Sequence, residues 1–263
     1  MNRIEEKFAF LKKQGKKALM PFITAGDPDM AMTGELVLAM AGSGADIIEL
    51  GVPFSDPLAD GPVIQASSRR ALDKNASLHS ILGLVKKLRK RTDVPLVLMS
   101  YLNPVWRYGI ADFVSSCESN GVDGVIVPDL VPEEASVLIR SARKKNISTI
   151  FLVSPTTSSE RTALIAARCT GFVYYVSLTG VTGTKAALSD TLVGELDRIR
   201  RFVRMPIACG FGISNAAQAG EVSHHTDGVI IGSAIVSLIE RGRGKKKILA
   251  DVEKFVSALK RNI

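Results

Sequence analysis

Short apolar runs alternate with amphipathic segments along the whole chain, and this alternation predicts most of the fold. The runs are nearly continuous in valine, isoleucine and leucine, which is typical of strands covered on both faces, as in a parallel sheet. We predict strands at residues 18–23, 46–50, 94–100, 124–127, 148–153, 171–176, 206–209 and 228–231. Apolar residues at helical spacing predict helices at residues 32–41, 77–90, 133–144, 158–168, 190–203 and 214–222, and near 246–260.

Three of the predicted strands share a local pattern, in which a helix ends at a turn and an aspartate stands at the start of the apolar run. The aspartates are Asp46, Asp123 and Asp227, and the intervals of 77 and 104 residues between them fit two and four strand-helix units. The regular alternation indicates an α/β protein. We predict a (β/α)8 TIM barrel, with a doubly wound open sheet as the alternative. No linker divides the chain, so we expect a single domain over residues 1–263 with an extra N-terminal helix.

The composition is that of an ordinary globular protein, with 46% apolar and 23% charged residues. The first residues lack the apolar core of a signal peptide, and no apolar stretch is long enough to cross a bilayer, so we expect a cytoplasmic protein with no membrane association. Cys117, Cys169 and Cys209 form no CxxC pair. The neighbours His224 and His225 would point in different directions on a helix or a strand. We therefore predict neither a disulfide framework nor a metal site.

The formal net charge of +8 raises the question of nucleic-acid binding. Dense basic clusters fall within residues 86–91, 140–145 and 198–204, and each lies where a predicted helix ends. Cations at these positions complement the partial negative charge of a helix C-terminus, which is a role in stability. The chain has one tryptophan, four tyrosines and no basic segment interleaved with aromatic residues, so we expect no nucleic-acid binding.

Glycine-bearing turns follow the last three predicted strands, at the end of the barrel where such folds carry their functional loops. Glycine lets backbone N–H groups approach an anion closely, and a short helix after the last strand would add the partial positive charge of its N-terminus. One such turn alone is better explained as a tight turn, but the three together favour a phosphate site. The turns contain Gly180 and Gly183, Gly210 and Gly212, and Gly232 with Ser233. The absence of GxGxxG and Walker sequences disfavours a Rossmann or P-loop nucleotide site.

Two carboxylates near the second predicted strand are candidates for acid and base chemistry. Glu49 stands near the end of the strand among apolar neighbours, so burial should raise its pKa and let it donate a proton near neutral pH. Asp60 lies on a loop framed by proline and glycine, where we expect better solvation and an ionised carboxylate. The alternative is that Glu49 pairs with a basic group inside the barrel, and that Asp56 and Asp60 form turns or helix caps. These residues alone do not decide between the two.

Several motifs, in one order and spacing, resemble the α subunit family of tryptophan synthase. They are "PFITAGDP", "ELGVPFSDPLADGPVIQAS", "VPDL", "YYVSLTGVTG", "GFGIS" and "GSAIV", and they extend from the first predicted strand towards the last helix. The resemblance implies a (β/α)8 barrel that cleaves indole-3-glycerol phosphate to indole and glyceraldehyde 3-phosphate without a cofactor of its own. It also implies a β subunit that carries pyridoxal phosphate, in an α2β2 assembly.

The resemblance also implies roles for individual residues. Asp60 would bind the indole N–H and help to take its proton, and Glu49 would protonate the indole C3 and then assist loss of the glycerol hydroxyl proton. Phe22 and Tyr175 match positions that line the substrate pocket. The positions that match the phosphate site are Gly183, Gly212, Gly232 and Ser233.

Two loop residues would serve closure and communication. Thr182 matches the loop that closes over substrate, and Asp56 matches the loop that meets the β subunit. Leu178 and Thr179 stand where some family members have an arginine, so an electrostatic contact made by that arginine is in doubt. Two rival readings remain, another phosphate-binding barrel such as an FMN-dependent oxidoreductase, and a noncatalytic activator of a β subunit.

Overall fold

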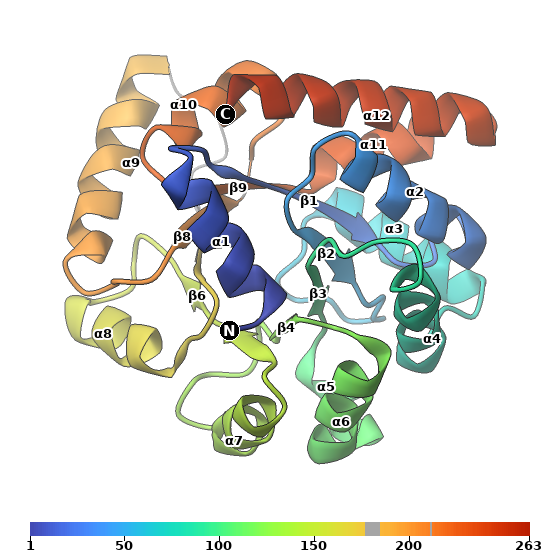
Figure 1. Ribbon diagram of the computed structural model, residues 1–263, viewed down its shortest axis with the longest axis horizontal. Helices are drawn as coiled ribbons and strands as arrows, with labels where there is room; N and C mark the ends of the chain where they lie inside the picture. The colour runs from blue at the N-terminus through green and yellow to red at the C-terminus, as the bar shows by residue number, and fades with distance from the viewer. Residues whose placement is uncertain (177–184, 211) are drawn as a thin grey trace.

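The strands form one parallel sheet that is rolled into a nearly closed barrel (Figure 1). The computed structural model describes residues 1–176, 185–210 and 212–263. Within them the strand order is β5-β4-β3-β2-β1-β9-β8-β7-β6. The strands are β1 (Ala18–Thr24), β2 (Ile48–Gly51), β3 (Leu96–Met99), β4 (Gly124–Ile126), β5 (Ser148–Ile150), β6 (Leu152–Val153), β7 (Val173–Val176), β8 (Ile207–Gly210) and β9 (Gly228–Ile231).

All eight predicted strand regions are confirmed, and one of them is divided. The predicted strand at residues 148–153 is interrupted at Phe151, so that β5 pairs with β4 and β6 pairs with β7. Because β5 and β6 are consecutive in the chain but stand at the two ends of the strand order, the backbone between them brings the edges of the sheet together. The barrel is therefore the observed architecture, and the doubly wound open sheet is excluded.

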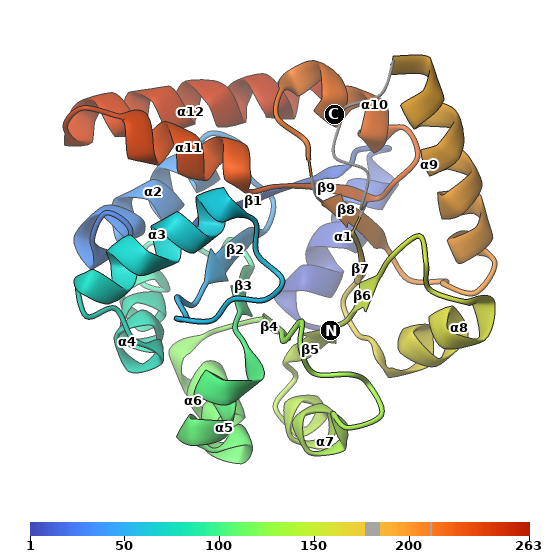
Figure 2. The same cartoon turned by 180° about the vertical axis from the view of Figure 1, so that it is seen from behind.

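Helices surround the barrel on its outside, except for the first, which lies across one end (Figures 1 and 2). They are α1 (Arg3–Lys13), α2 (Met30–Gly42), α3 (Pro62–Asp73), α4 (Leu78–Leu88), α5 (Leu102–Tyr108), α6 (Ile110–Asn120), α7 (Ser136–Lys144), α8 (Ser159–Arg168), α9 (Lys185–Arg200), α10 (Ala216–Ser223), α11 (Ser233–Arg241) and α12 (Lys245–Asn262). In the described part of the chain, none of these helices has both the length and the apolar character needed to cross a bilayer.

The predicted helices omit α3, α5 and α6, and each omission has a physical reason. The buried residues of α3 are small, Ser67, Ser68 and Ala71, so the helix has no apolar stripe, and it begins with Pro62 at its first position. Helices α5 and α6 are separated only by Gly109, whose φ of 91° breaks the helical period. Short helices of this kind give a weak periodic signal.

Helix α1 closes the barrel at the N-terminal ends of the strands, and it faces the viewer in Figure 1. Ile4, Phe8 and Leu11 are buried against inward-facing strand residues. Burial of each such side chain contributes about 1.5–3 kcal/mol. Asn2 caps the helix and also donates from Nδ2 to Ser148 Oγ at 2.7 Å, which fixes α1 to β5. The extra N-terminal helix is confirmed, and it makes this end of the barrel a packed core.

The three aspartates that share a local sequence pattern, Asp46, Asp123 and Asp227, have the same structural role. Each carboxylate accepts a hydrogen bond from the backbone N–H of the first or second residue of a neighbouring strand and pairs with a basic side chain. Asp123 accepts from Leu96 N at 2.8 Å and pairs with Arg89 at 2.6 Å. Asp46 pairs in the same way with Lys260, and Asp227 pairs with Arg200. The basic residues at helix ends therefore complement these aspartates as well as the helix C-termini.

Candidate active site

A cavity of about 690 Å³ opens at the C-terminal ends of the strands, at the opposite end of the barrel from α1. Figure 2 views the molecule from this side, with α1 behind the strands. Side chains from most strands line the cavity, together with the loop before α3 and the first residues of α11. The strand residues are Phe22, Glu49, Met99, Ile126, Leu152, Val153, Tyr174, Val176 and Ile230.

Glu49 lies on β2 and is buried, with 1% of its surface exposed. Its neighbours across the sheet are Phe22 on β1 and Val97 on β3. Neither carboxylate oxygen has a hydrogen-bond partner among the described residues. Burial, and then the nearby charge of Asp60, raise the pKa of Glu49 from 4.5 to about 8. A basic partner inside the barrel, the alternative left open by the sequence, is not found in the described part of the chain.

Asp60 lines the same cavity from the loop before α3, and it is half-buried. Burial raises the pKa of Asp60 from 3.8 to about 6, while a hydrogen bond from the Tyr101 hydroxyl acts in the opposite direction. Asp60 is therefore less exposed to solvent than the sequence led us to expect. The order of the two groups is nevertheless the expected one, since at neutral pH Asp60 is ionised while Glu49 holds its proton.

Tyr174 lines the cavity, and the expectation that Tyr175 does so is wrong. Side chains alternate between the two faces of a strand, so adjacent residues on β7 point in opposite directions. Tyr175 is buried outside the barrel, where its hydroxyl donates a hydrogen bond to Glu195. Gly210 on β8 makes room for the inward ring, because a Cβ at this position would lie 2.5 Å from the Tyr174 hydroxyl oxygen.

Phe22 also lines the cavity, as expected, and two glycines make room for its ring. A Cβ at Gly51 would lie 2.5 Å from Cζ of Phe22, and a Cβ at Gly232 would lie 3.2 Å from Cδ1. The first distance is too short for any Cβ, so Gly51 cannot be replaced without moving the ring. The glycines after the strands therefore shape the apolar wall of the cavity as well as its turns.

The turns after β8 and β9 form the adjoining wall of the cavity. Gly212, Ser214, Gly232 and Ser233 line the cavity there. Gly232 is the N-cap of α11, and Ser233 is the first residue of that helix, so the free N–H groups of its first turn lie at the cavity wall. Gly212 has a φ of 75°, a conformation that favours glycine.

Several predicted residues lie outside the described part of the chain. Gly180, Thr182 and Gly183 belong to this group, together with Leu178 and Thr179. Their proposed roles in phosphate binding and loop closure stay predictions.

Asp56 lies on the loop between β2 and α3 and is exposed. It accepts a hydrogen bond from the neighbouring Ser55 hydroxyl, and it is not among the residues that line the cavity. Its side chain is therefore placed for contact with another molecule more readily than for catalysis, and its role in communication stays a prediction.

Arg70 connects two helices whose first residues border the cavity. Its guanidinium group donates from Nη2 to the buried Asp27 at 2.8 Å and from Nη1 to Glu240 of α11 at 2.7 Å. Ser67 donates a further hydrogen bond to Asp27. These contacts tie α3 both to α11 and to the loop after β1.

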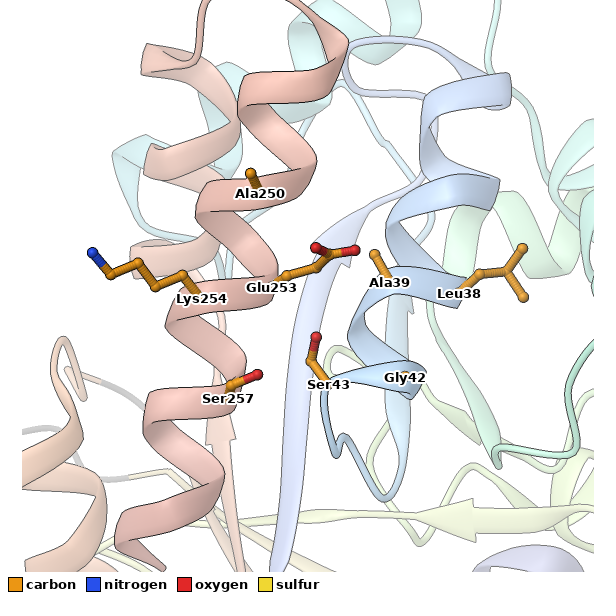
Figure 3. Close-up of a pocket in the computed structure, with 8 residues that line it drawn as sticks. All are labelled: Leu38, Ala39, Gly42, Ser43, Ala250, Glu253, Lys254 and Ser257. Atoms are coloured by element: carbon orange, nitrogen blue, oxygen red, sulfur yellow. The ribbon is translucent and has the colours of Figure 1, made fainter.

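A second hollow lies on the outer surface, between α2 and α12 (Figure 3). Small residues border it on both helices, and in Figure 3 the side chain of Glu253 points towards Ala39 while that of Lys254 points away. Both charged side chains are exposed. We interpret this hollow as an ordinary surface groove between two packed helices. Among the residues that the structure describes, no group of three or more histidine, cysteine, aspartate or glutamate residues could hold a metal ion.

Comparison with known proteins agrees with this site. The sequence model of the family described as "Tryptophan synthase alpha chain" matches residues 8–263. This chain belongs to the tryptophan synthase alpha chain family. The alpha chain of Geotalea uraniireducens (strain Rf4) is 49% identical over 263 residues, which cover 100% of this chain and 98% of that protein.

Solved structures of family members have the same fold. The tryptophan synthase alpha subunit of Legionella pneumophila str. Paris superposes with a TM-score of 0.93 at 38% identity, covering 100% of this chain and 98% of the other. A chain from the tryptophan synthase a2b2 complex of Pyrococcus furiosus has a TM-score of 0.85 at 40% identity, covering 92% and 97%. As a member of this family the chain is a lyase subunit of tryptophan synthase, with its role in tryptophan biosynthesis.

The site also contains residues that the sequence analysis did not single out. The Tyr101 hydroxyl accepts a hydrogen bond from the backbone N–H of Ala59, next to Asp60, and Tyr174 forms part of the cavity wall together with Glu49. Knowledge of the strand register would have identified Tyr174, since it lies one residue from Tyr175 on the same strand. No signal in the sequence connects Tyr101 with Ala59, because the two residues are far apart in the chain.

Proposed function

We propose that this chain cleaves indole-3-glycerol phosphate to indole and D-glyceraldehyde 3-phosphate by a retro-aldol reaction. One observation carries the proposal. Glu49 and Asp60 face one cavity in unlike environments, which give pKa values of about 8 and about 6. At neutral pH the pair therefore supplies one proton donor and one proton acceptor, and the reaction needs both.

The first step converts the indole ring into an electron sink. Protonated Glu49 gives its proton to C3 of the indole ring, and ionised Asp60 takes the proton from the ring nitrogen, which produces the indolenine tautomer. The substrate gains one proton and loses another, so its net charge does not change. The C=N bond of the indolenine is then placed to accept the electron pair of the bond that breaks.

The second step breaks the carbon-carbon bond and restores both carboxyl groups. Glu49, now ionised, takes the proton of the glycerol hydroxyl next to the ring, and the electron pair of the broken bond returns to the ring. The ring nitrogen regains its proton from Asp60. The products are indole and an aldehyde, and neither a Schiff base nor a metal ion is required.

The phosphate group would bind at the glycine-rich side of the cavity. Gly212, Gly232 and Ser233 are placed for backbone contacts, and the N-terminus of α11 favours an anion. We extend this site to Gly183, and loop closure to Thr182, by family resemblance. The apolar wall with Phe22 and Tyr174 suits the indole ring.

The proposal includes a β subunit as partner, which would hold the pyridoxal phosphate, while this chain has no cofactor of its own. The Pyrococcus furiosus relative is described as part of an a2b2 complex, and we propose the same α2β2 arrangement here. The proposal also keeps the cytoplasmic location predicted from the sequence.

Exposed apolar side chains support a partner surface on the cavity side of the barrel. Leu58 is 91% exposed, Trp106 is 69% exposed and Val131 is 40% exposed. They lie after β2, β3 and β4, which are neighbours in the sheet, so the three residues belong to one side of the cavity rim. Large exposed apolar residues that gather in one region mark contact sites. Asp56 lies on the same loop as Leu58, which is consistent with its predicted contact with the β subunit.

A direct assay tests the proposal. The purified chain is mixed with indole-3-glycerol phosphate, with and without a β subunit, and release of glyceraldehyde 3-phosphate is measured. We expect Glu49→Gln and Asp60→Asn each to lower the rate at least about a hundredfold, the usual scale for a lost general acid or base. Turnover near the wild-type rate in either variant would remove that residue from its role.

The same assay separates the rival functions. A noncatalytic activator would stimulate the β subunit but release no aldehyde from indole-3-glycerol phosphate in any mixture. A flavin-dependent oxidoreductase would be purified as a yellow protein. Tryptophan formation from indole-3-glycerol phosphate and serine, with a cognate β subunit present, would support the whole assignment.

A further inference from the structure

Arg70 joins helix α3 to two other parts of the chain. Its guanidinium group donates from Nε to Asp27 Oδ1 at 3.0 Å and from Nη2 to Asp27 Oδ2 at 2.8 Å. The third nitrogen, Nη1, donates to Glu240 Oε1 on α11 at 2.7 Å. Two parallel hydrogen bonds to one carboxylate fix the orientation of both groups, which a contact between two point charges does not do. One side chain therefore constrains how α3 lies against α11 and against the loop after β1.

The Asp27 carboxylate is a buried anchor for α3. Only 3% of Asp27 is exposed, and besides the two bonds from Arg70 its Oδ2 accepts a hydrogen bond from Ser67 Oγ at 2.5 Å. Ser67 and Arg70 lie three residues apart in the helix and therefore face the same side of it. Both residues hold the same face of α3 to the loop after β1.

Helix α3 depends on these contacts because it lacks an apolar stripe. A helix that covers a barrel normally packs through such a stripe, but the buried residues of α3 are Ser67, Ser68 and Ala71. Among the described residues, Ser67 and Arg70 make the side-chain hydrogen bonds from α3 to other helices and to loops after other strands. The polar contacts therefore have a large part in placing this helix.

Helices α3 and α11 both begin at the cavity and lie side by side (Figure 2). Asp60 lines the cavity just before α3, and Gln65 in the first turns of that helix donates to the Asp60 carbonyl at 2.8 Å. Gly232 and Ser233 line the cavity at the start of α11. In the proposed function the ring nitrogen of the substrate lies at Asp60 and its phosphate at the start of α11. The two helices would then hold the two ends of one molecule.

We propose that Arg70 is a positioning residue, which keeps Asp60 and the first turn of α11 at the separation that one substrate molecule requires. The inference rests on the proposed function, because that function places the two ends of the substrate on the two helices. Arg70 is not among the described residues that line the cavity, so it acts through the helices and not on the substrate. A displacement of about 1 Å at a reacting group can lower a rate about a hundredfold.

The test compares ligands that reach one helix with a ligand that reaches both. Arg70→Lys keeps the positive charge, but one ammonium group cannot reproduce the two parallel bonds to Asp27 and also bind Glu240. The probes are indole, inorganic phosphate, and an unreactive analogue in which a saturated chain joins an indole ring to a phosphate. In NMR titrations we expect the analogue to bind about tenfold more weakly, while indole and inorganic phosphate bind as to the wild type. Only the joined ligand depends on the separation of the two helices.

A merely structural role for Arg70 predicts a different pattern. Partial unfolding would weaken the binding of all three ligands alike, and that result would overturn the inference, as would an unchanged affinity for the analogue. The cleavage rate provides a second measurement. With the β subunit present, we expect kcat for indole-3-glycerol phosphate to fall about tenfold or more in Arg70→Lys.

Two further variants complete the design. Glu240→Gln removes the charge at the exposed end of the network, so it should give the same pattern at smaller amplitude, and it replaces Arg70→Lys if that variant does not fold. Arg3→Lys is the matched control, because Arg3 is a partly exposed arginine that pairs with the buried Asp123 at 3.0 Å at the other end of the barrel. It should change neither affinity nor rate. Wild-type affinity for the analogue in Glu240→Gln, or weakened affinity in Arg3→Lys, would contradict the inference.

A measurement without ligand keeps this test separate from that of the proposed function. The three cysteines of the chain are buried, so spin labels can be attached selectively to Ala66→Cys on α3 and Arg241→Cys on α11, two exposed positions. Electron paramagnetic resonance gives the distribution of distances between the labels. It should widen or shift in Arg70→Lys and stay unchanged in Arg3→Lys, and identical distributions in all three proteins refute the inference. If the wild type binds no analogue, the proposed function fails, and the label distances still decide whether Arg70 places the two helices.

Discussion

Replacement of Glu49 by glutamine should change how the stability of the protein depends on pH. In the folded chain the pKa of Glu49 is about 8, against a usual value of 4.5, because the carboxyl group is buried. Between these two pH values the unfolded chain releases the proton while the folded chain keeps it. The free energy of unfolding of the wild type must therefore fall as pH rises through this window. Glutamine has almost the same shape and cannot ionise, so Glu49→Gln lacks this contribution.

The magnitude follows from the two pKa values. A pKa difference from 4.5 to about 8 corresponds to about 5 kcal/mol at 1.36 kcal/mol per unit, and about 4 kcal/mol of this falls between pH 5 and pH 8. Glu49→Gln should therefore gain about 4 kcal/mol relative to the wild type over that range. Asp60 titrates in both proteins, so its contribution largely cancels in the comparison.

Urea unfolding followed by circular dichroism at a series of pH values provides the assay. The matched control is Glu253→Gln, the same chemical change at an exposed position on α12, which should leave the pH dependence as it is in the wild type. Equal slopes for Glu49→Gln and the wild type would refute the reasoning, since they would show that Glu49 ionises in the folded protein as easily as in the unfolded chain.

Three further outcomes are expected. The pH profile of kcat/KM should be bell-shaped, rising through about 6 as Asp60 ionises and falling through about 8 as Glu49 loses its proton, with both values belonging to the coupled pair. Gly210→Ala should raise KM about tenfold, because its Cβ displaces the Tyr174 ring into the cavity, and Tyr174→Phe should restore part of the loss. Asp123→Asn should lower the free energy of unfolding by about 3 kcal/mol without changing kcat, because it removes a buried ion pair far from the cavity, as urea titration and the cleavage assay would show.

The strands and their order could be predicted because both faces of each strand are covered. A continuous apolar run such as that at Gly228–Ile231 has no other simple explanation, and the predicted bounds are those observed. Helix α3 could not be found in this way, because it buries serine and alanine instead of an apolar stripe. Its presence matters for the site, since it begins two residues after Asp60 and Arg70 ties it to α11.

Only those features of the site that depend on neighbouring residues in the sequence could be predicted. The sequence places Glu49 at the end of a strand, but whether a cation reaches its carboxylate depends on residues far away in the chain. Tyr174 and Tyr175 differ only in the face of β7 that they occupy, and a shift of one residue exchanges an inward for an outward position. The hydrogen bond from the Ala59 backbone N–H to the Tyr101 hydroxyl joins the loop before α3 to the loop after β3, and no local sequence pattern predicts that these two segments meet.

These exceptions fall where the chain departs from the rules that stabilise a fold. A buried acid without a hydrogen-bond partner among the described residues, such as Glu49, lowers stability at neutral pH and above. Elsewhere in the barrel the opposite holds, since Asp46, Asp123 and Asp227 each have a backbone donor and a basic partner. The aspartates at the N-terminal end of the barrel therefore stabilise the strands, and the carboxylates at the C-terminal end are left free to exchange protons with a substrate. Local propensity fails to explain a residue mainly where function requires that residue.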